Sequence, residues 1–293
     1  MCNDFTEQEN ESFERAGGRI NRRDSSLLGT AAIFAAMYPG LAHAEKAVTE
    51  IEVEVTMAQG TSDCYFVHPA EGKHPAVLMW PDIRGLRPAF KAMGKRLAMA
   101  GYSVLVVNPF YRDAKAPVVE PGASFRDPAV REVLIPMARK LTQDASMSDA
   151  RDYITFLDQQ ESVDTNRKVG TAGYCMGGPL IMRTAGAVPE RVGAAASFHA
   201  GGMVTDQDDS PHLLIPTSPA HVLHAIAEND DERSPDVKTV LAEAYAKAGT
   251  PAEIEVYEGT LHGWCPPDSQ VYNEAQAERA WSRMLALFKT ALA

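Results

Sequence analysis

The fold of this chain is decided by the stretch Lys168-Val169-Gly170-Thr171-Ala172-Gly173-Tyr174-Cys175-Met176-Gly177-Gly178. A short β-prone run leads into Gly-x-Cys-x-Gly, and a helix-compatible run follows it. Such a sharp strand-to-helix turn presents a nucleophile, since its glycines leave room where a Cβ would clash and can take a positive φ. The helix N-terminus favours a negative sulfur, so we expect a lowered pKa for the Cys175 thiol. The alternative is a small buried cysteine in a glycine-rich turn.

The rest of the chain alternates between strand and helix patterns. Continuous apolar runs at 76–80 and 102–108 are typical of strands buried on both faces. Further strands are expected at 51–57, 62–67, 193–198, 220–227 and 252–257, and helices at 88–100, 144–159, 179–187, 235–248 and 273–292. This alternation predicts one α/β domain with a mostly parallel central sheet flanked by helices. Residues 111–130 are rich in Pro, Asp and Ala and predict an irregular loop or cap over a site.

Composition and charge exclude several classes of partner. The 293 residues are 45% hydrophobic and 23% charged, which is ordinary for a globular protein with a sizeable core. The formal net charge of −11 argues against nucleic acid and anionic membrane surfaces, because both call for basic patches. A small-molecule substrate is compatible with this charge, whereas the oligomeric state is not indicated by the sequence.

The first 44 residues have the organisation of a cleavable export signal. A polar region ending in Arg22-Arg23 precedes a short apolar run at 27–38, and Ala42-His43-Ala44 supplies a small-x-small cleavage site. The arginine pair resembles a twin-arginine signal, which indicates export to the periplasm. The apolar run is shorter than the roughly 20 residues that span a bilayer, so cleavage is favoured over a membrane anchor or a buried helix. The mature domain is then residues 45–293, without stable membrane insertion.

Three cysteines remain after this cleavage: Cys64, Cys175 and Cys265. In an oxidising compartment an odd number leaves at least one thiol unpaired. If Cys175 is the nucleophile, the other two are free to form a disulfide. We favour two separate buried thiols, because sequence alone does not supply the geometry that a disulfide needs.

Two partners for Cys175 follow later strands. The acidic run Glu228-Asn229-Asp230-Asp231-Glu232 comes after the strand ending at Ala227, and His262 lies in a glycine-flanked loop after the last strand. A Cys–His pair generates thiolate, and a carboxylate holds the tautomer of the imidazole. We therefore expect His262 to be the general base. Asp230 is preferred over Asp231 as the carboxylate, because it occupies the fourth position of the turn.

Together these residues resemble the dienelactone hydrolase family over roughly residues 50–292. The resemblance rests on Trp80-Pro-Asp-Ile-Arg-Gly85, Asn108-Pro-Phe-Tyr-Arg112, Gly173-Tyr-Cys-Met-Gly-Gly178, Ala227-Glu-Asn-Asp230 and Gly259-Thr-Leu-His262. It implies an α/β-hydrolase fold and hydrolysis of an ester or lactone through a Cys-Asp-His triad, without metal or cofactor. It also implies an oxyanion hole formed by the backbone N–H groups of Ile83 and Met176. The family often has a proline four residues after its acid, and Pro235 would then select Asp231.

The same resemblance assigns substrate-binding positions. Where the family has a glutamate that contacts the resting thiol, this chain has Asp82, which is one methylene shorter. Arg112 falls near an arginine that binds a substrate carboxylate in the family, whereas Pro266 stands where a second arginine is expected. His199 and Trp264 are further candidates to line the pocket, with packing roles as the alternative. Two other functions stay open: a thiol-redox or thiol-transfer protein using Cys175 with Cys265, and a non-catalytic binding protein on a hydrolase scaffold.

Overall fold

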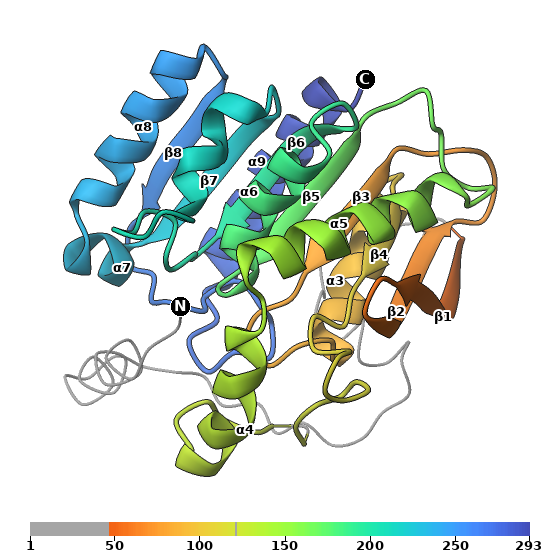
Figure 1. Cartoon of the computed structure of the whole chain (residues 1–293), viewed down its shortest axis with the longest axis horizontal. Helices are drawn as coiled ribbons and strands as arrows, with labels where there is room; N and C mark the ends of the chain where they lie inside the picture. The colour runs from red at the N-terminus through yellow and green to blue at the C-terminus, as the bar shows by residue number, and fades with distance from the viewer. Residues whose placement is uncertain (1–46, 121) are drawn as a thin grey trace.

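The structure is a computed structural model that describes residues 47–120 and 122–293. Its centre is one eight-stranded sheet in the order β1-β2-β4-β3-β5-β6-β7-β8 (Figure 1). The strands are β1 (Val48–Met57), β2 (Gly60–Pro69), β3 (Ala76–Trp80), β4 (Ser103–Val106), β5 (Val169–Tyr174), β6 (Val192–Phe198), β7 (His221–Ala227) and β8 (Ala252–Tyr257).

The sheet has an antiparallel edge and a parallel body. β1 and β2 form a hairpin with a ten-residue register from Val48–Pro69 to Met57–Gly60, and β2 pairs antiparallel with β4. From β4 to β8 all neighbours are parallel. The carboxyl ends of β3, β5, β6, β7 and β8 therefore lie at one edge of the sheet, where open α/β sheets bind their ligands.

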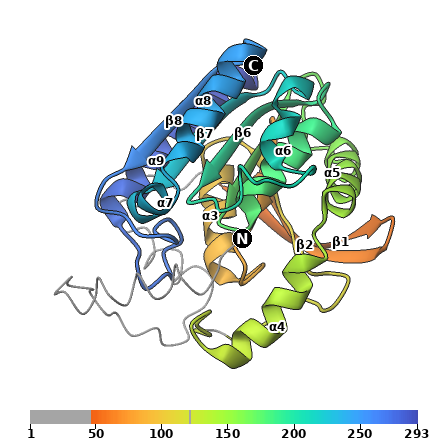
Figure 2. The ribbon, with the colours of Figure 1, turned by 60° about the vertical axis from the view of Figure 1, so that its left-hand side comes forward.

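Helices cover both faces of this sheet (Figures 1 and 2). The helical segments are α3 (Pro88–Met99), α4 (Pro128–Arg139), α5 (Gln143–Asp158), α6 (Gly177–Ala187), η2 (Pro211–Thr217), α7 (Glu228–Arg233), α8 (Asp236–Ala248) and α9 (Glu274–Ala291). Local chemistry sets several ends: Pro88 opens α3, Thr142 caps α5, and Gly249 ends α8 with a φ of 69°.

Two apolar clusters lie on opposite faces of the sheet. One joins Met79 and Val104 to Phe90 of α3 and Phe288 of α9. The other joins Leu78 and Leu105 to side chains of α5, α6 and α8, such as Tyr153, Ile181 and Leu241. Because β3 and β4 are entirely buried, alternate residues feed alternate clusters, which is why these strands have continuous apolar sequences.

The predicted α/β fold with its mostly parallel sheet is confirmed, and each predicted strand and helix has its counterpart within a few residues. Sequence analysis did not identify α4, η2 and α7. Pro136 lies inside α4, which argues against a helix in the sequence, and only Leu134 of α4 is buried. Both figures show α4 extending away from the sheet layers (Figures 1 and 2). The irregular segment predicted over 111–130 is irregular at 111–120 and 122–127, whereas its last three residues, 128–130, belong to α4. Val118 of this segment lies beside Gly85.

The predicted export signal, residues 1–44, lies outside the described residues, so its status as a prediction is unchanged. Within residues 47–120 and 122–293 we find no helix with the length and apolar character required to cross a bilayer.

Candidate active site

Cys175 occupies the turn between β5 and α6. Its φ of 53° lies in the left-handed region that residues with a Cβ rarely adopt. A Cβ on Gly173 would lie 2.1 Å from the carbonyl oxygen of Gly177, and one on Gly177 would lie 2.5 Å from that of Trp80. The two glycines therefore allow backbones to approach closely, while the positive φ falls on Cys175 itself. Strain of this kind is common where a side chain must be presented for function.

Three buried side chains form a continuous hydrogen-bonded line. His262 Nε2 lies 3.1 Å from Cys175 Sγ, and His262 Nδ1 lies 2.7 Å from Asp230 Oδ2. They come from the carboxyl ends of β5, β8 and β7. Burial alone would raise the pKa of Asp230, but neighbouring His262 and Arg233 outweigh burial and lower it. Asp230 is therefore a carboxylate that can fix the imidazole tautomer.

The structure separates the two candidate aspartates. Asp230 is 7% exposed and directs one oxygen to His262 and the other to Arg233. Asp231 instead accepts hydrogen bonds from Lys238 Nζ on both oxygens, at 2.8 and 2.5 Å. The turn of α7 thus brings Asp230 to the imidazole and directs Asp231 to the surface of α8.

Two contacts that sequence analysis missed hold the loop of His262 against α7. The backbone N–H of His262 donates to Asn229 Oδ1 at 2.8 Å, and that of Gly259 donates to Glu228 Oε2 at 2.9 Å. Asn229 and Glu228 directly precede Asp230, so one short helix supports both the imidazole and its loop. Their position within the acidic run was the only available signal.

The backbone N–H groups of Ile83 and Met176 belong to the turns that follow two adjacent strands. Ile83 follows β3 and Met176 precedes α6, and β3 and β5 are adjacent strands. Among the described residues neither N–H donates a hydrogen bond. Met176 also stands at the N-terminus of α6, where the helix dipole favours negative charge.

Asp82 and Arg112 are both engaged by protein side chains. Arg87 binds the two oxygens of Asp82 at 2.6 and 2.8 Å, so that carboxylate faces a guanidinium. Arg112 donates to both oxygens of Asp149 at 2.8 and 2.7 Å and to Gln59 Oε1 at 2.6 Å. A substrate carboxylate would have to displace Asp149 to bind Arg112 in this arrangement.

The ring of His199 lies beside the imidazole of His262, and the ring of Trp264 lies beside that of His199. The ring centroid of His199 is 5.3 Å from that of His262 and 6.3 Å from that of Trp264. Within the described part of the chain, neither ring nitrogen of His199 nor Nε1 of Trp264 has a hydrogen-bond partner. Burial, and then the neighbouring His262, lower the pKa of His199 to about 3, so its ring is neutral. Both residues can contact a ligand or simply pack, as the sequence left open.

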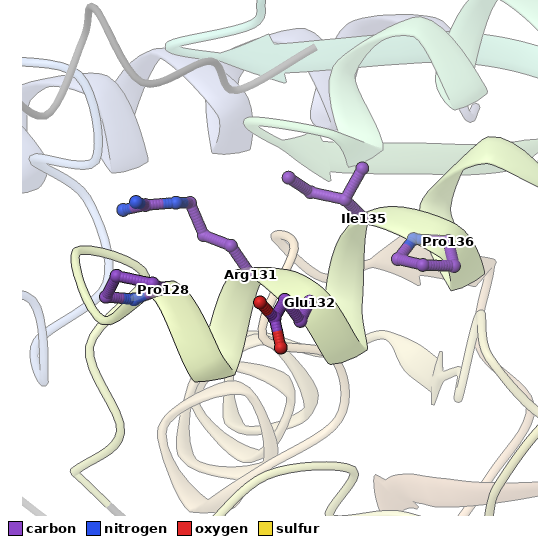
Figure 3. Close-up of a pocket in the computed structure, with 5 residues that line it drawn as sticks. All are labelled: Pro128, Arg131, Glu132, Ile135 and Pro136. Atoms are coloured by element: carbon purple, nitrogen blue, oxygen red, sulfur yellow. The ribbon is translucent and has the colours of Figure 1, made fainter.

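Away from this region, a hollow of about 400 Å³ lies along α4. The described residues that line it belong to this helix, and Figure 3 shows Arg131 and Ile135 rising from the same side of it. Cys175 is not among the described residues that line this hollow. In the residues the structure describes, no three His, Cys, Asp or Glu side chains are grouped to hold a metal ion.

The other two cysteines of the domain lie on opposite faces of the sheet. Cys64 belongs to the cluster under α5, and Cys265 belongs to the cluster under α3 and α9. Both are free and buried, as predicted. Burial raises the pKa of Cys64 to about 12 and raises that of Cys265 as well, so both thiols stay protonated at neutral pH.

Comparison with known proteins agrees with this arrangement. The sequence pattern of the dienelactone hydrolase family matches residues 62–292. The chain belongs to the dienelactone hydrolase family. This confirms the resemblance drawn from the sequence, and with it the α/β-hydrolase fold.

Relatives and solved structures of this family differ in how much of the chain they share. The carboxymethylenebutenolidase of Rhodococcus opacus is 23% identical over 253 residues, which cover 82% of this chain and 91% of the relative. Protein usf of Aquifex pyrophilus is 29% identical over 124 residues, so the match spans about half the length of that relative, 51%. A dienelactone hydrolase-like promiscuous phosphotriesterase from metagenomic libraries has the same fold, with a TM-score of 0.70 and 19% identity over 84% of this chain and 100% of that one.

Proposed function

We propose that this protein hydrolyses a carboxylic ester or lactone through Cys175, His262 and Asp230. The observation that carries the proposal is the hydrogen-bonded line from Cys175 Sγ to His262 at 3.1 Å and on to Asp230 at 2.7 Å. A nucleophile, a base and an orienting carboxylate at these separations are the parts of a nucleophilic hydrolase. Family membership and the names of relatives support the same reaction class.

The first half of the proposed reaction makes a thioester. His262 takes the thiol proton, and the Cys175 thiolate attacks the carbonyl carbon of the substrate. The oxyanion accepts hydrogen bonds from the N–H groups of Ile83 and Met176. The intermediate collapses, the C–O bond breaks, and His262 gives its proton to the leaving alkoxide. An ester releases an alcohol, whereas a lactone keeps the new hydroxyl on the acyl chain.

The second half regenerates the enzyme. His262 takes a proton from a water molecule, and the hydroxide attacks the thioester carbonyl over the same N–H groups. The C–S bond breaks, the carboxylic acid leaves, and the thiolate remains beside a protonated imidazole. Asp230 stabilises the imidazolium in both halves, because its carboxylate faces Nδ1. No step in this scheme draws on a metal or an organic cofactor.

The substrate is proposed to be a small molecule. His199, whose ring lies beside that of His262, and Trp264, whose ring lies beside that of His199, are the proposed pocket residues. Arg112 and Asp82 are weaker candidates for substrate contact, because each is held by a side chain of opposite charge. Since Pro266 occupies the second arginine position of the family, we expect uncharged acyl groups to be accepted at least as well as lactones that carry a free carboxylate.

The test is acyl-enzyme formation with a panel of p-nitrophenyl esters and small lactones. We expect a burst of p-nitrophenol equal to the enzyme concentration, with one acyl group on the Cys175 peptide by mass spectrometry. Cys64→Ala serves as the matched control, because it removes a buried thiol whose hydrogen-bond partner is Ser62 and not a member of this line. The absence of any acyl-enzyme across the panel would favour a binding protein. A thiol-redox protein would instead consume peroxide with a change in titratable thiols.

A further inference from the structure

A buried arginine joins the loop after β3 to the loop after β8. Arg87 is 8% exposed and lies between two carboxylates. Its Nη1 and Nη2 donate to the two oxygens of Asp82 at 2.6 and 2.8 Å. Its Nε and Nη2 donate to the two oxygens of Asp268 at 2.7 and 3.0 Å. Arg84 contacts Asp268 as well, at 3.2 Å, so the cluster contains two positive and two negative groups.

The two carboxylates belong to the loops that carry the proposed chemistry. Asp82 directly precedes Ile83, whose backbone N–H is a proposed oxyanion donor. Asp268 follows His262 by six residues in the same loop, yet lies 181 residues from Arg87 in sequence. The guanidinium therefore bridges the loop after β3, which contains Ile83, and the loop after β8, which contains His262.

The geometry of the bridge is specific for arginine. The planar fork meets one carboxylate on each of two edges, and its face lies 4.8 Å from the ring centroid of Phe90. Burial alone would raise the pKa of Asp82, but Arg87 and Arg84 beside it lower that pKa to about 2. Burial and the same two arginines act likewise on Asp268, whose pKa is also lowered. Both carboxylates are thus charged at any pH at which the enzyme would work.

We propose that Arg87 is a positioning residue that holds the Ile83 N–H in register with Cys175 by fixing the loop after β3 to Asp268. The proposal rests on the function proposed above. The guanidinium touches no reacting atom; it acts through Asp82 and Asp268. Its loss would leave the hydrogen bond between Cys175 and His262 in place, since α7 supports that loop independently through Asn229. The bridge would therefore affect oxyanion stabilisation more than thiolate formation.

The test compares measurements that require the oxyanion site with one that does not. All are made on the reduced protein, as wild type, Asp268→Asn and Arg87→Lys. Ester turnover and inhibition by a trifluoromethyl ketone require the oxyanion site, because both place negative charge on oxygen. Alkylation of Cys175 by iodoacetamide requires the thiolate but forms no oxyanion. Asp158→Asn is the matched control, since it breaks a two-point arginine pair with Arg191, at 2.6 and 3.0 Å, away from these loops.

We expect Asp268→Asn to lower kcat by about 10- to 100-fold with little change in KM, because misplacing one oxyanion donor has effects of that order. The ketone Ki should rise by a similar factor, while the alkylation rate of Cys175 changes by less than about threefold. Arg87→Lys should reproduce these losses, since an ammonium cannot bind two carboxylates in this fork geometry. Asp158→Asn should leave both reactions unchanged.

Several results would overturn the proposal. Turnover of Asp268→Asn within twofold of wild type would show that the bridge does not position the donor. Equal losses in turnover and alkylation would mean that the cluster supports the thiol–imidazole pair instead. Wild type that alkylates at Cys175 but hydrolyses no ester would remove the proposed function, and the bridge's role with it. If Arg87→Lys fails to fold, Asp268→Asn alone decides, because it preserves the shape of the side chain.

Discussion

Cys175 is the residue on which the proposed chemistry depends most directly. Cys175→Ala should lower ester turnover by at least about 10³-fold, since removing a nucleophile leaves only the residual catalysis of the binding site. Thermal stability should change little, because the change removes one sulfur from a buried turn. Initial rates and a melting curve on the same preparation check both statements. Turnover retained in Cys175→Ala, with Cys64→Ala as control, would contradict the nucleophile assignment.

Asp230 and Asp231 are adjacent, yet their carboxylates have different partners. Asp230→Asn should lower turnover strongly, by up to about 10⁴-fold in the serine-protease precedent and less if the Cys–His pair is already ionised. Asp231→Asn should have a small effect, because its carboxylate binds Lys238. Rates on one activated ester for both variants check this. A large loss confined to Asp231→Asn would reverse the assignment.

The sequence indicated some of these residues and not others for a physical reason. Cys175 and His262 lie in glycine-flanked turns directly after buried strands, so local pattern reveals them. The choice between Asp230 and Asp231 required the direction of each side chain from α7, which spacing does not determine. Arg87 gave no signal at all, because its partner Asp268 is 181 residues away.

At the scale of the element, the β5–α6 turn depends on the absence of a side chain at Gly173. Gly173→Ala would place a Cβ 2.1 Å from the carbonyl oxygen of Gly177, so strand and helix must separate. We expect a destabilisation of about 1–3 kcal/mol or more, and a loss of turnover, as for other overpacked sites. Gly186→Ala in α6 is the control, since its Cβ would meet Leu214 at an ordinary 3.4 Å. Equal denaturation midpoints for the two variants would contradict this view of the turn.

A second buried histidine predicts how β6, β7 and α8 respond to acid. His224 Nδ1 lies 2.7 Å from Ser197 Oγ, and Nε2 lies 2.9 Å from the hydroxyl of Tyr245. Burial lowers the pKa of His224 to about 3, so the folded protein keeps this ring neutral where the unfolded chain would protonate it. The unfolded state then binds the extra proton between about pH 6.5 and 3, and stability falls as the pH falls through that window.

His224→Gln tests this, because an amide keeps polar atoms near Ser197 but does not titrate. As the pH falls through that window, the free energy of unfolding of wild type should decrease by up to about 1.4 kcal/mol per pH unit more than that of the variant. Urea titrations at pH 7, 6, 5 and 4 measure the slopes. Equal slopes for the two proteins would show that His224 does not contribute to the loss of stability in acid.

Strands were easier to predict than helices in this molecule, since β3 to β7 are buried by the layers on both faces. The continuous apolar run of β3, Ala76–Trp80, reflects that burial directly. By contrast α7 consists of Glu-Asn-Asp-Asp-Glu-Arg, which as a sequence is indistinguishable from a solvated turn. Its helical form matters for the site, because it directs Asp230 inward.

For the molecule as a whole, the order and direction of the strands determine which residues meet at the candidate site. Parallel strands place the carboxyl ends of β3, β5, β7 and β8 side by side, so residues as far apart in sequence as Arg87 and Asp268, 181 positions, meet there. The antiparallel hairpin β1–β2 forms one side of the sheet, beyond β4, and contributes no member of the hydrogen-bonded line. In the sequence, however, it is the described element that follows the proposed cleavage site most closely, since β1 begins at Val48.

We propose that residues 1–44 direct export and are then removed, leaving residues 45–293. Cleavage after Ala44 would leave every paired residue of β1 in place, since its register with β2 begins at Val48. Mass spectrometry of the exported protein should therefore give an N-terminus at or near Glu45, with melting and turnover equal to those of a chain expressed as 45–293. Replacing Arg22 and Arg23 by lysine should block export through a twin-arginine route, whereas Arg15→Lys should not. Full-length chain found only in the cytoplasm, with Arg22 and Arg23 intact, would contradict the export signal. Export that persists in the double lysine variant would contradict only the route.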